Sequence, residues 1–112
     1  MMKPIVKLYF TDDNNEKFFG EGPYQLLLAI EKHHSLSAAA KSMDMAYSKA
    51  VRLINRAEEV YNTPLITRTT GGRDGGGSVL TDFSRELVQK YGEYKKACNS
   101  ACKELYNQIF AG

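Results

Sequence analysis

A run of polar side chains in the middle of the chain carries the groups best suited to chemistry. They recur at helical spacing and offer hydroxyl, amine, guanidinium and amide groups: Tyr47, Ser48, Lys49, Arg52, Asn55 and Arg56. Such groups hydrogen-bond the base edges and phosphates of nucleic acids. Arg52 is the best candidate for a base contact, because its planar fork of donors matches the edge of guanine. The alternative is an ordinary solvated helix surface, which the same residues would also make.

A helix must hold these side chains, and the sequence predicts one from about Tyr47 to Tyr61. The residues expected to face its core are Ala46, Ala50, Leu53, Ile54, Ala57 and Tyr61. A shorter helix is predicted before it, from Ser37, whose hydroxyl can cap the helix, to about Met43. Asp44-Met45-Ala46 forms a tight break between the two. Two helices joined in this way are typical of a helix-turn-helix.

Two β-prone runs follow the helices, at residues 65–69 and 78–80. Residues 70–77 join them and include five glycines, so this segment is predicted to be a flexible or tightly turned loop. Arg68 and Arg73 add cations to the second half of the motif. A helix-turn-helix followed by a two-stranded wing is a device that holds one helix in a DNA groove.

The glycine-rich loop could instead be a phosphate cradle of an enzyme, but its spacing is wrong. Gly72 and Gly77 lie as far apart as in a P-loop, yet Ser78 stands where that motif requires lysine. No grouping of serine, histidine and acid suggests a nucleophilic triad. His33 and His34 have no Cys, Asp or Glu at ligand spacing. The sequence therefore predicts no enzyme, no metal site and no cofactor.

The segments on either side complete the expected architecture. Residues 5–10 and 17–19 read as an N-terminal hairpin, with Asp and Asn residues at its turn. A helix is predicted from about Pro23 to His33. Its expected buried stripe is Tyr24, Leu27, Leu28 and Ile30.

A long final helix is predicted after Thr81, whose hydroxyl can cap it. Its apolar stripe has near-heptad spacing and comprises Phe83, Leu87, Tyr91, Tyr94, Cys98, Ala101, Leu105 and Ile109. At 1.5 Å per residue the helix would span roughly 40 Å, more than so small a domain can cover, so part of the stripe should pack against another chain. Cys98 and Cys102 share a face of this helix. Buried packing of reduced thiols is favoured over a metal or redox role, which stays open.

Composition and charge fit one DNA-binding domain. The net charge is only +2, but residues 37–73 hold six basic and three acidic side chains, while residues 1–36 carry a net −1 and residues 74–112 are neutral. Phosphate binding needs such local charge. No apolar run approaches the ~20 residues of a membrane span, and no signal peptide is evident, so a cytoplasmic protein is expected.

The fold class expected is mainly α with small β-hairpins: a winged helix-turn-helix with a long C-terminal dimerisation helix. It divides into an N-terminal hairpin (1–20), the helix-turn-helix and wing (22–81) and the dimerisation helix (82–112).

The block from Gly22 to about Tyr91 resembles the N-terminal DNA-binding domain of the molybdate-responsive ModE regulators. The matching residues are Ser35-Leu36-Ser37, Ala39-Ala40-Lys41, Tyr47, Ile54-Asn55, the wing from Arg68 through Gly77, and Leu80-Thr81. The helix-turn-helix of LysR-type regulators is similar over Ser35 to Thr81, but usually lacks the triple glycine. Two departures are Ala46, where the ModE family usually has serine, and Val51-Arg52, where it has Trp-Asp. The altered reading surface implies a different operator.

The resemblance implies a transcription regulator that binds a palindromic operator in double-stranded DNA as a homodimer. The DNA-binding residues expected are Ser37, Tyr47, Ser48, Lys49, Arg52, Asn55, Arg56, Arg68 and Arg73. The family's molybdate sensors have C-terminal oxyanion-binding domains, and no molybdate-binding domain is recognised in this chain. The rival hypotheses are a winged-helix protein-interaction module without DNA binding and a thiol- or metal-responsive regulator that uses Cys98 and Cys102.

Overall fold

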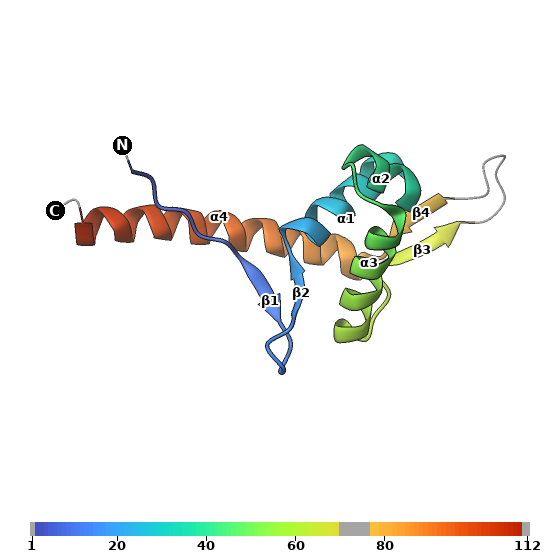
Figure 1. The fold of residues 1–112 in the computed structure, drawn as a ribbon, viewed down its shortest axis with the longest axis horizontal. Helices are drawn as coiled ribbons and strands as arrows, with labels where there is room; N and C mark the ends of the chain where they lie inside the picture. The colour runs from blue at the N-terminus through green and yellow to red at the C-terminus, as the bar shows by residue number, and fades with distance from the viewer. Residues whose placement is uncertain (1, 70–76, 111–112) are drawn as a thin grey trace.

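A computed structural model describes residues 2–69 and 77–110. Helices and two small antiparallel hairpins alternate along the chain (Figure 1). The elements are β1 (Tyr9–Thr11), β2 (Lys17–Gly20), α1 (Glu21–His33), α2 (Leu36–Ser42), α3 (Tyr47–Tyr61), β3 (Ile66–Thr69), β4 (Gly77–Leu80) and α4 (Asp82–Phe110). This is the predicted winged helix-turn-helix followed by a long helix.

The three short helices pack around one apolar core, to which both hairpins and the start of α4 contribute. The buried apolar residues are Phe19, Leu26, Leu27, Ile30, Leu36, Ala39, Ala40, Ala50, Ile54, Ala57, Leu65, Leu80 and Tyr91. Alanines where α2 and α3 meet the core keep the helices close. The predicted stripe of α1 was wrong at Leu28, which is exposed, because Leu26 is the residue that points inward.

The wing is anchored to the end of α1. Strands β3 and β4 pair in regular antiparallel register from Ile66 opposite Leu80 to Thr69 opposite Gly77. The N–H of Ser78 donates to the carbonyl of His34 (2.9 Å), where α1 ends in a left-handed conformation. The base of the wing is therefore tied to the helix-turn-helix. Residues 70–76 of the glycine-rich loop, with Arg73, lie outside the described residues.

The N-terminal hairpin is joined to the body by aromatic rings. Its first strand is shorter than predicted, because only Tyr9–Thr11 pair with β2 and the register shifts after Phe10. Phe10 and Phe19 both pack against Tyr91, at ring-centroid separations of 5.7 and 5.2 Å. The hydroxyl of Tyr91 donates to the carbonyl of Leu8 (2.8 Å). These contacts hold the hairpin and the preceding segment against α4.

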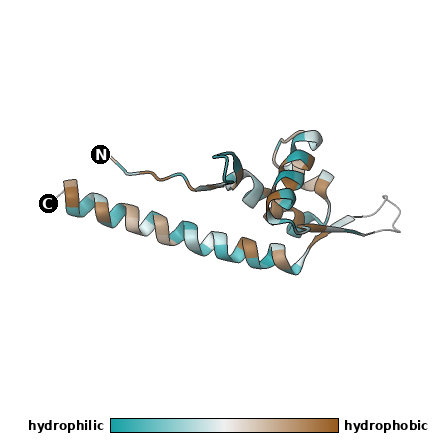
Figure 2. Ribbon diagram, turned by 90° about the horizontal axis from the view of Figure 1, so that it is seen from below, coloured by the Kyte–Doolittle hydropathy of each residue, from teal (hydrophilic) through white to brown (hydrophobic). Residues whose placement is uncertain are grey.

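Helix α4 belongs to the body only over its first half. The hydroxyl of Thr81 accepts from the N–H of Ser84 (3.2 Å), which confirms the predicted cap. Tyr94 and Lys95 still contact the body, through Phe10 and Glu21. Beyond Lys95 the helix leaves the body, and its brown apolar residues continue to the end in Figure 2. Leu105, Ile109 and Phe110 are 53%, 71% and 75% exposed. Within the described residues, no helix is both long enough and apolar enough to cross a bilayer.

Candidate nucleic-acid interface

Helix α3 has the bounds predicted from its sequence, Tyr47–Tyr61. A tight turn precedes it, in which Asp44 has positive φ and the N–H of Met45 donates to the carbonyl of Ala40 (2.9 Å). The inward face is formed by Ala50, Ile54 and Ala57, as expected. Ala46 is the N-cap and is exposed, so its predicted place in the core was wrong. A residue at this position precedes the first helical turn and does not share the helix's inward face.

The polar face of α3 is open to solvent. Tyr47, Ser48, Lys49, Arg52 and Asn55 are all exposed. Among the described residues, Lys49 and Arg52 make no ion pair or side-chain hydrogen bond. Two cations and neighbouring hydroxyl and amide groups are thus displayed along one rigid element. Their proposed contacts with DNA remain a prediction.

Arg56 differs from the other members of this set. Its guanidinium donates to the carboxylate of Asp12 and lies 3.4 Å from that of Glu16, both in the turn between β1 and β2. Its side chain is 28% exposed and that of Asp12 is 18% exposed. Hydrogen bonds from the N–H of Glu16 and from Arg56 lower the pKa of Asp12, and the contact with Asp12 raises the pKa of Arg56.

Helix α2 begins two residues earlier than a cap at Ser37 would allow. Ser35 is the N-cap, and its hydroxyl accepts from the N–H of Ala38 (3.1 Å). Ser37, the residue expected to cap, lies inside the helix and is exposed. The prediction failed because two serines of equal capping ability are two residues apart. Ser37 nevertheless stands at the N-terminal end of α2, where a hydroxyl can face a phosphate.

The part of α3 that carries Asn55 faces the base of the wing. Asn55 of α3 and Arg68 of β3 line the same small hollow, of about 150 Å³, and both are exposed. The carboxylate of Glu58 accepts from the N–H of Leu65 (2.7 Å), which fixes the passage from α3 into β3. The structure therefore brings Asn55 and Arg68 together, while the tip of the wing, with Arg73, lies outside the described residues.

Sequence reasoning missed three carboxylates that shape this region: Asp12, Glu16 and Glu58. Asp12 was recognised only as part of a turn. Nothing in local spacing could pair it with Arg56, which lies 44 residues away in the sequence. Glu58 and Leu65 are seven residues apart, on either side of the end of α3. Neither helical nor β-strand spacing predicts a contact between them.

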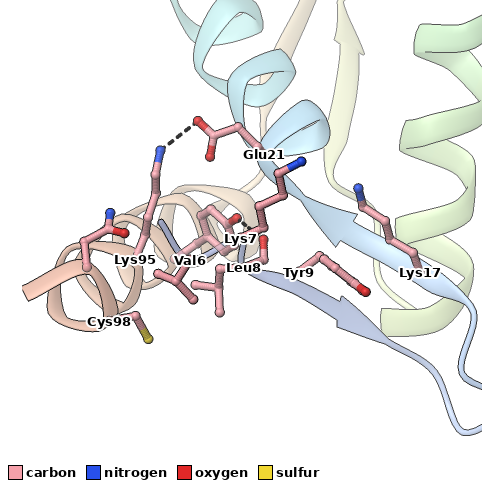
Figure 3. Close-up of a pocket in the computed structure, with 10 residues that line it drawn as sticks. Val6, Lys7, Leu8, Tyr9, Lys17, Glu21, Lys95 and Cys98 are labelled. Atoms are coloured by element: carbon pink, nitrogen blue, oxygen red, sulfur yellow. Dashed lines mark hydrogen bonds and ion pairs between the residues drawn. The ribbon is translucent and has the colours of Figure 1, made fainter. Parts of the chain in front are cut away.

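Two hollows run along α4, away from the polar face of α3. Figure 3 shows the first, of about 450 Å³, between the N-terminal segment and the helix. At its rim the ammonium of Lys95 lies 2.7 Å from the carboxylate of Glu21. The second, of about 480 Å³, is almost wholly apolar and includes Leu105 and Ile109. Val6 and Cys98 line both, so the two hollows are neighbours.

The two thiols lie in this second region. Cys98 and Cys102 are both free and half-buried, and both line the apolar hollow. In the part of the chain that the structure describes, no three side chains of His, Cys, Asp or Glu are grouped so that they could hold a metal ion.

The arrangement matches a known class of regulators. The family described as bacterial regulatory helix-turn-helix protein, lysR family, matches residues 24–85, from α1 to the first turn of α4. The chain belongs to this lysR family. The matched residues include α2, α3 and the wing, so the exposed helix α3 lies within this family's DNA-binding motif.

Curated relatives of this lysR-family chain confirm the resemblance to the ModE regulators. It is 36% identical over 92 residues to the molybdenum transport protein ModE of Azotobacter vinelandii, covering 79% of this chain and 34% of that protein. It is 38% identical over 66 residues to the DNA-binding transcriptional dual regulator ModE of Escherichia coli K12, covering 59% and 25%. The chain therefore spans about a third or less of the length of these relatives.

Solved structures confirm the fold. A LysR family transcriptional regulator aligns with a TM-score of 0.53 at 24% identity, covering 78% of this chain and 28% of that one. CouR from Rhodococcus jostii RHA1, solved with p-coumaroyl-CoA, aligns with a TM-score of 0.53 at 21% identity, covering 84% and 62%. At these identities the likeness concerns architecture alone.

Proposed function

We propose that the chain is a sequence-specific transcription regulator that reads double-stranded DNA with α3. The observation that carries the proposal is the open polar face of α3, with Lys49 and Arg52 free of ion pairs among the described residues, inside a lysR-family helix-turn-helix. An α-helix fits the major groove, and a guanidinium fork reads guanine there. We assign Arg52 to a base edge, with Ser48 and Asn55 beside it.

The neighbouring groups would position the duplex. Ser37 at the start of α2 and Lys49 on the flank of α3 are suited to backbone phosphates, since such contacts fix register without reading sequence. Arg68 on β3, with the wing beyond it and Arg73, would meet the adjacent stretch of backbone or minor groove. Tyr47, exposed at the start of α3, would stack on a sugar or on a thymine methyl group.

We further propose a homodimer built on α4. The apolar hollow along the distal half of this helix includes Leu105, Ile109 and Phe110 and is exposed in the single chain. A second α4 would cover it, as the near-heptad stripe requires. Two copies related by a two-fold axis favour a palindromic operator, with half-site centres roughly 34 Å apart, one turn of DNA.

The proposal that the protein binds DNA also bears on its location in the cell and on whether it catalyses a reaction. Chromosomal DNA lies in the bacterial cytoplasm, so we place the protein there. We propose no catalytic activity, because reading DNA uses the polar groups of α3 as hydrogen-bond donors and acceptors and needs no reaction.

Selection of bound duplexes from a random pool, followed by fluorescence anisotropy at several salt concentrations, tests the DNA proposal. We expect a palindromic selected sequence and binding that weakens steeply with salt. Arg52→Ala should cost about 1–3 kcal/mol of binding free energy and relax selectivity at one base pair. Lys96→Ala is the matched control, because it removes one exposed cation from α4, away from α3.

Two results would oppose this reading. No salt-sensitive binding even at low ionic strength would leave the rival, a protein-interaction module. An Arg52→Ala variant that binds the selected duplex like the Lys96→Ala control would remove Arg52 from the reading role.

Sedimentation analysis tests the dimer separately. Leu105→Asp should convert the dimer to a monomer, because it places a charge in the proposed apolar seam. A wild-type protein that stays monomeric at concentrations where it binds the selected duplex would exclude the homodimer.

A further inference from the structure

The turn between β1 and β2 sets two acidic side chains against the hairpin-facing flank of α3. One oxygen of the Asp12 carboxylate accepts the N–H groups of Asn14 (2.8 Å) and Glu16 (3.0 Å) within the turn. Its other oxygen accepts from the guanidinium of Arg56, and the carboxylate of Glu16 lies 3.4 Å from the same group. The turn thus fixes the Asp12 carboxylate so that its second oxygen faces Arg56 on α3.

Arg56 has the chemistry of a phosphate-binding residue, but here carboxylates occupy it. A guanidinium uses the same fork of donors for carboxylate and for phosphate. The flank on which it stands also carries Lys49, and both line a hollow of about 240 Å³ between α3, β2 and the start of α1. Lys49 is exposed and has no ion-pair partner among the described residues, whereas Arg56 is half-buried and paired. Of the two cations on this flank, Lys49 is therefore open to a ligand, whereas Arg56 is occupied by carboxylates.

We propose that the acidic turn at residues 12–16 sets the extent of the DNA-reading surface by holding Arg56 in the place of a backbone phosphate. The carboxylates of Asp12 and Glu16 satisfy Arg56 and repel a phosphate that approaches it, while Lys49, farther along the helix, stays free to meet the backbone. The duplex would then contact α3 from Tyr47 to Asn55 only. This replaces the expectation that Arg56 itself contacts DNA. It rests on the proposed function, because it presumes that α3 reads DNA.

Salt dependence of binding can count phosphate contacts, since each one changes the slope of log K against log[salt] by about 0.9. The assay uses the duplex selected by the wild-type protein. Arg56→Gln alone should leave the slope unchanged, because Arg56 contacts no phosphate. The double variant Asp12→Asn, Glu16→Gln should steepen the slope by about one contact, because it frees Arg56. Asparagine keeps an oxygen for the N–H groups of Asn14 and Glu16, so the turn is retained.

A third variant separates release of Arg56 from a general loss of negative charge. When Arg56→Gln is added to the double variant, the slope should return to the wild-type value. Asp13→Asn is the matched control, because Asp13 is exposed in the same turn and makes no ion pair among the described residues. It should leave the slope unchanged. Circular dichroism of each variant verifies that the fold is kept.

The outcomes divide cleanly. A slope that falls by about one contact in Arg56→Gln alone overturns the proposal, since Arg56 would then bind phosphate despite its partners. A steeper slope that persists after Arg56→Gln is added to the double variant also overturns it. In both cases Arg52→Ala would still weaken binding, so the proposed function would stand. Absence of any selected duplex would overturn both.

Discussion

Gly77, at the first position of β4, lies directly against the end of α1. A Cβ atom built there would lie 2.4 Å from the carbonyl oxygen of His34 and 3.2 Å from the hydroxyl of Thr69. The first contact is with backbone, which cannot rotate away, and the adjacent N–H of Ser78 is bonded to the same carbonyl. Gly77→Ala must therefore push β4 away from the end of α1.

The size of the effect follows from two opposing terms. Overpacking of this kind costs about 1–3 kcal/mol. Replacing glycine by alanine also restricts the unfolded chain, which stabilises the folded state by about 0.4–1 kcal/mol. Combining the two ranges, we expect Gly77→Ala to lower the free energy of unfolding by up to about 2.5 kcal/mol. For domains near this size, each kcal/mol shifts Tm by about 4–8 °C.

Urea denaturation followed by circular dichroism measures this, with Gly22→Ala as the matched control. A Cβ atom at Gly22 meets nothing within 4 Å. This variant therefore restricts the unfolded chain in the same way but introduces no clash in the folded state. The difference in unfolding free energy between the two variants should be about 1–3 kcal/mol. Equal stabilities would refute the reasoning, because they would mean that β4 does not lie against the carbonyl of His34.

The remaining predictions concern single contacts, each measured by urea denaturation. Ser35→Ala should lower the free energy of unfolding by about 1 kcal/mol through loss of the α2 cap, whereas Ser37→Ala should be nearly neutral; equal effects would contradict the assigned cap. Tyr91→Phe should cost about 1 kcal/mol, because the carbonyl of Leu8 loses its donor; an unchanged midpoint would show that this bond does not stabilise the fold. The pKa of Asp12 is lower in the folded protein than in the unfolded chain, so its contribution is complete above about pH 4 and is lost as pH falls through the folded value. The stability advantage of wild type over Asp12→Asn should therefore shrink on acidification, and an advantage that is constant with pH would argue against the ion pair.

The sequence predicted best those features that depend on neighbours along the chain. The bounds of α3 follow from the spacing of Ala50, Ile54 and Ala57, and from the proline that follows the helix. Strands β3 and β4 follow from two short β-prone runs around a glycine-rich loop. Local periodicity decides which face of such elements is buried, so the exposed position of Arg52 could be anticipated.

Features that depend on distant partners could not be predicted in this way. The pairing of Arg56 with Asp12 arises only when the hairpin folds back onto α3, and the bond from Tyr91 to Leu8 joins residues 83 apart. Where two local choices were equivalent, as for Ser35 and Ser37, capping preference alone could not decide between them, and the structure has the cap at Ser35. Leu28 shows the same limit, because helical spacing allows more than one apolar stripe on α1.

The course of the N-terminal segment beside α4 has a practical consequence. Residues 2 and 110 lie at the same pole of the molecule, and the wing points from the opposite pole (Figure 1). A fluorophore or an immobilisation tag fused to either terminus would therefore stand clear of the helix-turn-helix. The same fusion would crowd the bare apolar end of α4. A bulky label could thus spare duplex binding and still disturb the proposed pairing of two copies through α4, which makes label size a variable to control in measurements of this protein.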